Sequence, residues 1–148
     1  MQVWEKLLAN KILISAVAAW LAAQGIKTAL YSLINKKFSW ERLTGSGGMP
    51  SSHAATVCAL ATASALEYGL SSFEFAVSLI LAAVVMYDAR GVRYESGRQA
   101  TVLNWILSRM EPHPEEKPID QLKEFIGHTL LQVVMGAILG IAVAVFLD

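Results

Sequence analysis

The chain has 148 residues, of which 55% are hydrophobic and only 16% are charged, and its mean hydropathy is +0.47. A soluble domain of this size needs fewer apolar residues, so the composition favours an integral membrane protein. Twelve basic residues balance twelve acidic ones, which argues against nucleic acid as a partner. The single cysteine, Cys58, excludes an intrachain disulfide.

Four apolar segments have the length and composition of membrane helices. The first contains one charge, Lys27, and is long enough to cross a hydrocarbon core about 30 Å thick. The second is uncharged but consists mainly of small residues, so we expect it inside a bundle. In the fourth, Gly136 and Gly140 permit close helix contact. The four segments are residues 12–35, 49–66, 70–87 and 129–147.

A polar stretch, residues 88–128, separates the third and fourth apolar segments. Within it, apolar residues at spacings of three and four predict a short amphipathic helix over residues 94–110, lying along the membrane surface or capping the bundle. Residues 111–121 contain three prolines, which predicts a surface loop that includes His113. The predicted fold is therefore an all-α integral membrane helical bundle of about four spans plus this amphipathic helix, forming a single domain over residues 1–148.

Basic residues are distributed unequally between the two sides of such a bundle. Four spans place both termini on one side, which carries two basic residues, Lys6 and Lys11. The opposite side carries nine, and the positive-inside rule makes that side cytoplasmic. We therefore expect a protein of the plasma (inner) membrane with its termini outside. The nine are Lys36, Lys37, Arg42, Arg90, Arg93, Arg98, Arg109, Lys117 and Lys123.

The same topology brings polar residues from different spans to the cytoplasmic face. Placing a polar side chain within or beside a membrane span costs free energy. Several such side chains at the same level of the membrane therefore indicate a functional site. Two histidines, a lysine and two arginines beside a Gly-Gly turn and a helix N-terminus supply what a phosphate group requires. Taken singly, each residue has a structural explanation, such as snorkelling for the lysine. The candidates are Lys27, Gly48, Ser51, Ser52, His53, Asp88, Arg90, Arg93 and His128.

Three stretches of the chain read GSGGMPSSHAATVCALATA, VMYDARGVRYESGRQATVLN and GHTLLQVVMGAILG. They resemble the divergent branch of the type 2 phosphatidic acid phosphatase superfamily. This superfamily is related to acid phosphatases and to vanadium-dependent haloperoxidases. The resemblance implies a helical membrane phosphatase with no metal or other cofactor, whose partners are membrane lipid and a lipid phosphate or pyrophosphate substrate.

The resemblance also implies a role for individual residues. Lys27 corresponds to the cation of the family's first motif, while Ser51 and the amides between Gly48 and Ser52 would hold phosphate oxygens. His53 corresponds to the general acid that protonates the leaving oxygen. His128 corresponds to the nucleophile that accepts the phosphoryl group as phosphohistidine.

The chain departs from the parent motifs at three points. Ser52 replaces a glycine, which is tolerable if only its backbone N–H binds phosphate. The third-motif arginine is missing before the nucleophile, so its role falls to Arg93, which we favour, or to Arg90. Gln132 replaces the aspartate that orients the nucleophile, and an amide stabilises imidazolium less than a carboxylate does. Asp88 is an alternative orienting group.

The sequence leaves two functions open. The first is a membrane phosphatase that hydrolyses a lipid phosphate or isoprenoid pyrophosphate through a phosphohistidine. The second is a non-catalytic protein that binds or translocates a lipid phosphate. A weaker hypothesis places a metal between His53, Asp88 and His128, although their spacing is not a known ligand pattern. A homodimer through the Gly136 and Gly140 surface is a further hypothesis.

Overall fold

The structure, a computed structural model, describes residues 3–36, 48–109, 122 and 127–148, and within these ranges every regular element is a helix. The apolar segments predicted as spans each coincide with one long helix, with ends that differ by at most three residues. The predicted loop over residues 111–121, with His113, lies outside the described residues. The helices are α1 (Val3–Leu8), α2 (Lys11–Asn35), α4 (Ser52–Tyr68), α5 (Phe73–Arg90), α6 (Val92–Leu107) and α7 (Leu130–Leu147).

Within the described residues, three helical stretches are long and apolar enough to cross a membrane: Lys11–Asn35, Phe73–Leu107 and Leu130–Leu147. Their large apolar side chains point outward, as Ile80 on α5 and Phe146 on α7 show with exposed fractions of 65% and 88%. The buried interior consists mostly of alanine. Large residues outside and small residues inside are the arrangement of a bundle solvated by lipid. The prediction of an all-α membrane bundle is confirmed.

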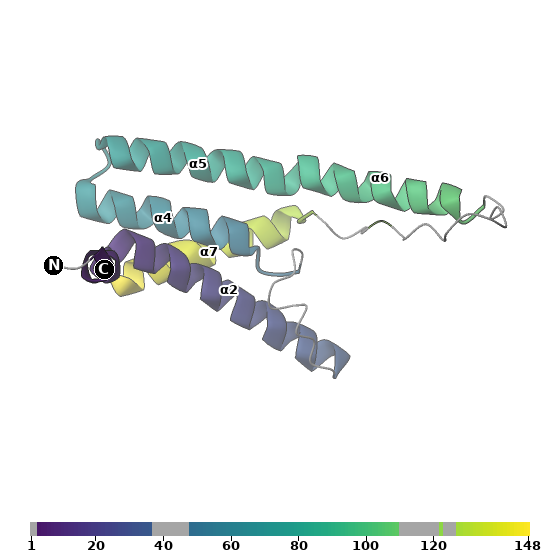
Figure 1. Cartoon of the computed structure of the whole chain (residues 1–148), viewed down its shortest axis with the longest axis horizontal. Helices are drawn as coiled ribbons and strands as arrows, with labels where there is room; N and C mark the ends of the chain where they lie inside the picture. The colour runs from purple at the N-terminus through teal and green to yellow at the C-terminus, as the bar shows by residue number, and fades with distance from the viewer. Residues whose placement is uncertain (1–2, 37–47, 110–121, 123–126) are drawn as a thin grey trace.

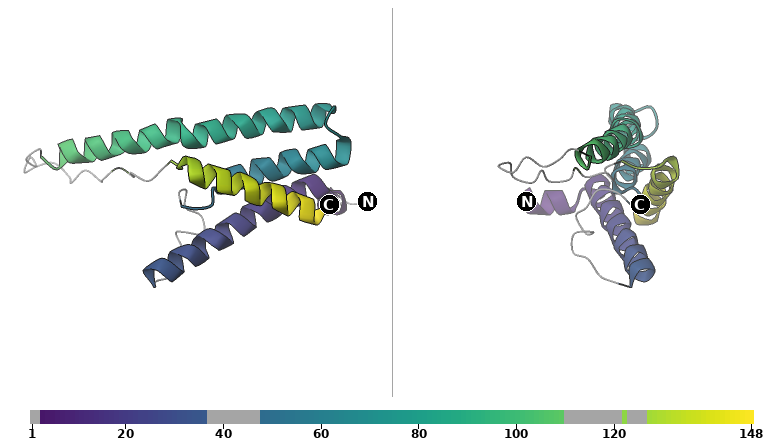
Figure 2. Two further views of the ribbon diagram at one scale, coloured as in Figure 1. Left: turned by 180° about the vertical axis from the view of Figure 1, so that it is seen from behind. Right: turned by 90° about the vertical axis from the view of Figure 1, so that its right-hand side faces the viewer.

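Helix α4 forms the centre of the bundle. It packs against α2, α5 and α7, which surround it in the end-on view of Figure 2. Ala54, Ala55 and Ala59 are completely buried. At 17 residues α4 is about 26 Å long, slightly less than the hydrocarbon thickness. Its small, weakly hydrophobic side chains suit a helix that contacts protein on most sides, as the sequence predicted.

The glycine pair of α7 packs against α4. A Cβ atom at Gly136 would overlap the carbonyl oxygen of Ser51, and one at Gly140 would overlap that of Ala55. The close helix contact predicted from this pair is therefore made within the chain. The homodimer stays a prediction, but the Gly136 and Gly140 surface on which it was based is covered by α4.

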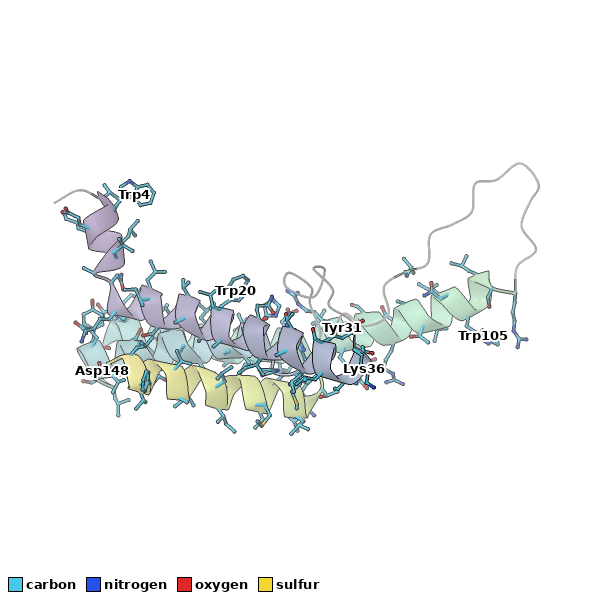
Figure 3. All side chains as sticks on the ribbon, turned by 90° about the horizontal axis from the view of Figure 1, so that it is seen from below. Trp4, Trp20, Tyr31, Lys36, Trp105 and Asp148 are labelled. Atoms are coloured by element: carbon cyan, nitrogen blue, oxygen red, sulfur yellow. The ribbon has the colours of Figure 1, made fainter. Side chains whose placement is uncertain are left out.

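The amphipathic helix between the third and fourth spans is α6, but it does not cap the bundle. It continues from α5 in nearly the same direction and projects beyond the other helices (Figure 1). Trp105 lies far along this projection (Figure 3). Among the described helices α6 packs only against α5.

Both termini lie at one end of the bundle (Figure 1), as expected for four alternating passes. Lys11 Nζ donates a 3.0 Å hydrogen bond to the main-chain oxygen of Asp148 there. Lys36 marks the opposite end in Figure 3. This opposite end, here called the site end, gathers the last turns of α2 and α5 and the beginnings of α4 and α7. Of the nine basic residues assigned to the cytoplasmic side, Lys37, Arg42, Lys117 and Lys123 lie outside the described residues.

Candidate functional site

His128 lies just before α7 at the site end. Its backbone N–H donates a 3.0 Å hydrogen bond to the carbonyl oxygen of Ala89 in the last turn of α5. The residue is only 1% exposed. Gly127 permits this close approach, because a Cβ atom there would overlap the backbone of Arg93 and Tyr94. The turn before α7 is thus clamped onto the junction of α5 and α6.

Gln132 determines which nitrogen of His128 carries the proton. The backbone N–H of Thr129 donates a 3.0 Å hydrogen bond to Gln132 Oε1, as part of a capping box that begins α7. Because an N–H group requires an acceptor, this atom is the amide oxygen. The same oxygen lies 3.2 Å from His128 Nδ1, so Nδ1 carries the proton and donates. The neutral ring therefore keeps the lone pair of Nε2 free of a proton.

His53, in the first turn of α4, faces His128. The two ring centroids are 6.1 Å apart, with an angle of 59° between the ring planes. His53 Nδ1 is buried and has no hydrogen-bond partner among the residues that the structure describes. The two imidazoles thus lie at the same end of the bundle and within reach of one small ligand.

Lys27 reaches this site from α2, about two turns before the helix ends. The side chain is 4% exposed, and its aliphatic stem runs over Gly48. A Cβ atom at Gly48 would lie 3.2 Å from Lys27 Cγ, and the φ angle of +87° also favours glycine. The turn before α4 is therefore shaped around the lysine.

Burial lowers the pKa of His128 below its ordinary value of 6.5. The hydrogen bond with Gln132 acts in the opposite direction and raises this pKa, while the positive charges of Lys27 and Arg93 lower it further. The imidazole is therefore largely neutral at pH 7. Lys27, Arg93 and His53 therefore all lie near enough to His128 for their positive charges to lower its pKa.

The two arginines differ in their surroundings. Arg93 Nε lies 2.6 Å from Asp88 Oδ2, and both side chains are partly exposed. Asp88 therefore pairs with Arg93, while Gln132 holds the His128 ring. Arg90 is exposed and lines a pocket that His128 also lines. The charge of Arg93 lowers the pKa of His128.

Ser51 has a structural role. Its N–H donates a 2.9 Å hydrogen bond to the carbonyl oxygen of Gln132, and its hydroxyl caps α4 by accepting from Ala54 N. The N–H groups of Ser52 and His53, in the first turn of α4, have no acceptor within that helix. These two amides remain for an anion.

A pocket of about 720 Å³ opens between α5, α6 and α7. His128, Thr129 and Arg90 are among its polar lining residues. Its walls are otherwise largely apolar. The apolar lining includes Ala83, Met86, Leu130 and Val133.

Within the described residues, no three side chains of His, Cys, Asp or Glu are grouped closely enough to hold a metal ion. His53, Asp88 and His128 accordingly do not form such a group.

The family model described as the divergent PAP2 family matches residues 8–143, which include every residue of the site. The chain belongs to the divergent PAP2 family. One relative of the chain is the uncharacterized membrane protein YuiD of Bacillus subtilis (strain 168). It is 41% identical over 152 residues, and the alignment covers 96% of each chain. No solved structure matches the chain.

Gly127 and Thr28 are not among the candidates from the sequence. Gly127 positions His128, and its only sequence signal is a glycine directly before the histidine. Thr28 follows Lys27, is 6% exposed and has a buried hydroxyl without a hydrogen-bond partner in the described part of the chain. Gln24, Lys27 and Thr28 are spaced by three and four residues, a polar stripe on an otherwise apolar helix that the sequence already contained.

Proposed function

We propose that this divergent PAP2 protein is a membrane phosphatase that hydrolyses a lipid phosphate or an isoprenoid pyrophosphate through a phosphohistidine on His128. The observation that carries the proposal is the 6.1 Å approach of the His53 and His128 rings beside buried Lys27. A nucleophile, an acid and a fixed positive charge are the groups that phosphoryl transfer needs.

His128 acts as the nucleophile. Its Nδ1 proton is held by Gln132, and the lowered pKa leaves Nε2 unprotonated at pH 7. Nε2 attacks phosphorus, and the bond to the leaving oxygen breaks with its electron pair on that oxygen. Water then attacks the phosphohistidine, which releases phosphate and restores the neutral ring.

His53 acts as the general acid for the leaving oxygen and accepts a proton from water in the second step. Lys27 and Arg93 stabilise the charge on the equatorial oxygens of the transition state. The free N–H groups of Ser52 and His53 add backbone donors at the positive end of the α4 dipole. With Lys and Arg beside the phosphate, the reaction needs no metal ion.

The membrane placement belongs to the proposal as well. Lys36, Arg90, Arg93 and the other basic residues near the site end favour the cytoplasmic face of the plasma membrane for the site, with the termini outside. A reporter fused after Asp148 tests this orientation.

Phosphate release by the purified full-length protein in detergent micelles tests the function. The substrates are a phosphatidic acid, an isoprenoid monophosphate and an isoprenoid diphosphate, with soluble glycerol phosphate for comparison. We expect release from at least one lipid substrate and much slower release from glycerol phosphate. The proposal fails if none of the lipids is hydrolysed between pH 5 and 8.

One observation favours the second function, a protein that binds or translocates a lipid phosphate without hydrolysing it. The His128 ring is held by the neutral amide of Gln132 where a carboxylate would stabilise imidazolium. Binding of a lipid phosphate that depends on Lys27 and Arg93, without turnover, would support this function.

The Gln132→Glu variant separates the two functions. Glutamate also suits the capping box, so the helix start is preserved. In the wild type, activity falls as His128 becomes protonated, and because its pKa is lowered this fall lies below pH 6.5. The new carboxylate raises the pKa, so we expect the acidic limb of kcat to move upward by about one pH unit and kcat to rise about tenfold.

The matched control for this variant is Gln99→Glu, which makes the same change on the exposed surface of α6. It should leave the pH profile unchanged. An acidic limb that does not respond to Gln132→Glu would remove His128 as the titrating nucleophile. A binding protein would show no turnover in any of the three proteins.

A further inference from the structure

The pocket between α5, α6 and α7 adjoins His128, but most of its lining residues have no role in the proposed hydrolysis. Its volume of about 720 Å³ falls within the range of about 300–1,000 Å³ that is usual for small-molecule pockets. Buried His128 is one of its lining residues. Its apolar walls come from α5 and α7, whose outer faces are the lipid-exposed ones. A ligand whose phosphate lies at His128 therefore continues into an apolar space.

Arg90 supplies the positive charge of this pocket. It lies at the end of α5, beside Tyr87 and Tyr94. The other charged lining residue, Glu95, pairs with Arg98 at 3.3 Å. Arg90 forms no ion pair with any residue that the structure describes. Its guanidinium can therefore offer its planar set of donors to a ligand anion.

The two arginines provide positive charge at two separate positions. Arg93 pairs with Asp88 and is not among the residues that line the pocket, whereas Arg90 and His128 both line it. A phosphomonoester held between His53 and His128 uses Lys27 and Arg93. The charge of Arg90 is then left for a second anionic group that lies between the reacting phosphorus and the apolar chain.

We infer that Arg90 is a specificity-determining residue that binds the second phosphate of a lipid diphosphate, with the apolar chain of that lipid in the pocket between α5, α6 and α7. This inference rests on the proposed function. The terminal phosphorus is attacked by His128 Nε2, the bridging P–O bond breaks, and its electron pair leaves on the lipid monophosphate. His53 gives a proton to the bridging oxygen and regains one from the water that hydrolyses the phosphohistidine. Arg90 stabilises the departing monophosphate.

The test compares farnesyl diphosphate with farnesyl monophosphate, which share one apolar chain. Phosphate release by the full-length protein in detergent gives kcat/KM for each. We expect the diphosphate to be favoured by about tenfold or more, and Arg90→Gln to reduce the ratio of the two kcat/KM values by about tenfold to a hundredfold. Arg90→Lys should restore part of the ratio. The matched control, Arg98→Gln on α6, should leave the ratio as in the wild type.

An unchanged ratio in Arg90→Gln overturns the inference, as does an equal loss for both substrates. If the wild type hydrolyses neither lipid, the proposed function fails, and equilibrium binding of the same two lipids then tests Arg90 by itself. In that experiment, a diphosphate-to-monophosphate affinity ratio that Arg90→Gln does not lower would overturn the inference.

Discussion

Replacing His128 is expected to abolish phosphate release, with kcat lower by about 10⁴-fold or more. The reason is that no other described side chain presents an unprotonated nitrogen opposite His53 in the position that His128 occupies. His128→Asn is the preferred variant, because its side-chain N–H can still donate to Gln132 while the nucleophilic nitrogen is lost. His128→Ala removes the hydrogen bond as well.

The measurement is steady-state phosphate release under saturating lipid, together with binding of the same lipid to the variant. Binding should persist, since Lys27, Arg93 and the α4 amides are unchanged. His113→Ala changes the one histidine of the chain that has no role in the proposed mechanism, so this control variant should retain activity. If His128→Asn kept more than a tenth of the wild-type kcat, the phosphohistidine mechanism would be wrong.

The second large effect is expected at Gly127, which touches no ligand. A side chain at this position overlaps the backbone at the start of α6, so Gly127→Ala must push His128 away from Ala89. Such overpacking destabilises a fold by about 1–3 kcal/mol. A displacement of about 1 Å at a reacting group costs about a hundredfold in rate. We expect both effects, measured as a lower thermal midpoint in detergent and a lower kcat.

Gly25→Ala is the matched control for Gly127→Ala. Gly25 lies inside α2, and a Cβ atom there would meet nothing within 4 Å. Because alanine is the better helix former, this variant should be as stable as the wild type or more stable, with unchanged kcat. A Gly127→Ala protein that behaves like Gly25→Ala would show that the clamp between α7 and α6 does not position His128.

The arrangement of the helices could be predicted from the sequence because hydropathy and residue size act locally. The lack of large side chains in α4 already predicted its interior position, and the polar residues at one end of each span predicted where they would meet. The convergence of His53 and His128 follows from four alternating passes. Distances between them do not follow, since they depend on how closely the helices approach.

The contacts that the sequence did not predict are those between backbones. Gly127 against Tyr94 and the Ser51 amide against Gln132 depend on a three-dimensional approach that no linear pattern records. Gln132 was interpreted only as a weakened aspartate, although the Thr129 to Gln132 spacing is that of a capping box. The direction of α6, which continues from α5 in nearly the same direction (Figure 1), was not predicted, because no pattern in the sequence determines the angle between two successive helices.

The most direct test of the central claim is to trap the phosphoryl group on the protein. Full-length protein is mixed with a lipid phosphate labelled on its terminal phosphate, quenched in alkali during turnover and mapped by peptide mass spectrometry. The account predicts an acid-labile, alkali-stable label on the peptide that contains His128, and none in His128→Asn. Phosphate release without any labelled histidine, or a label on another residue, would contradict it.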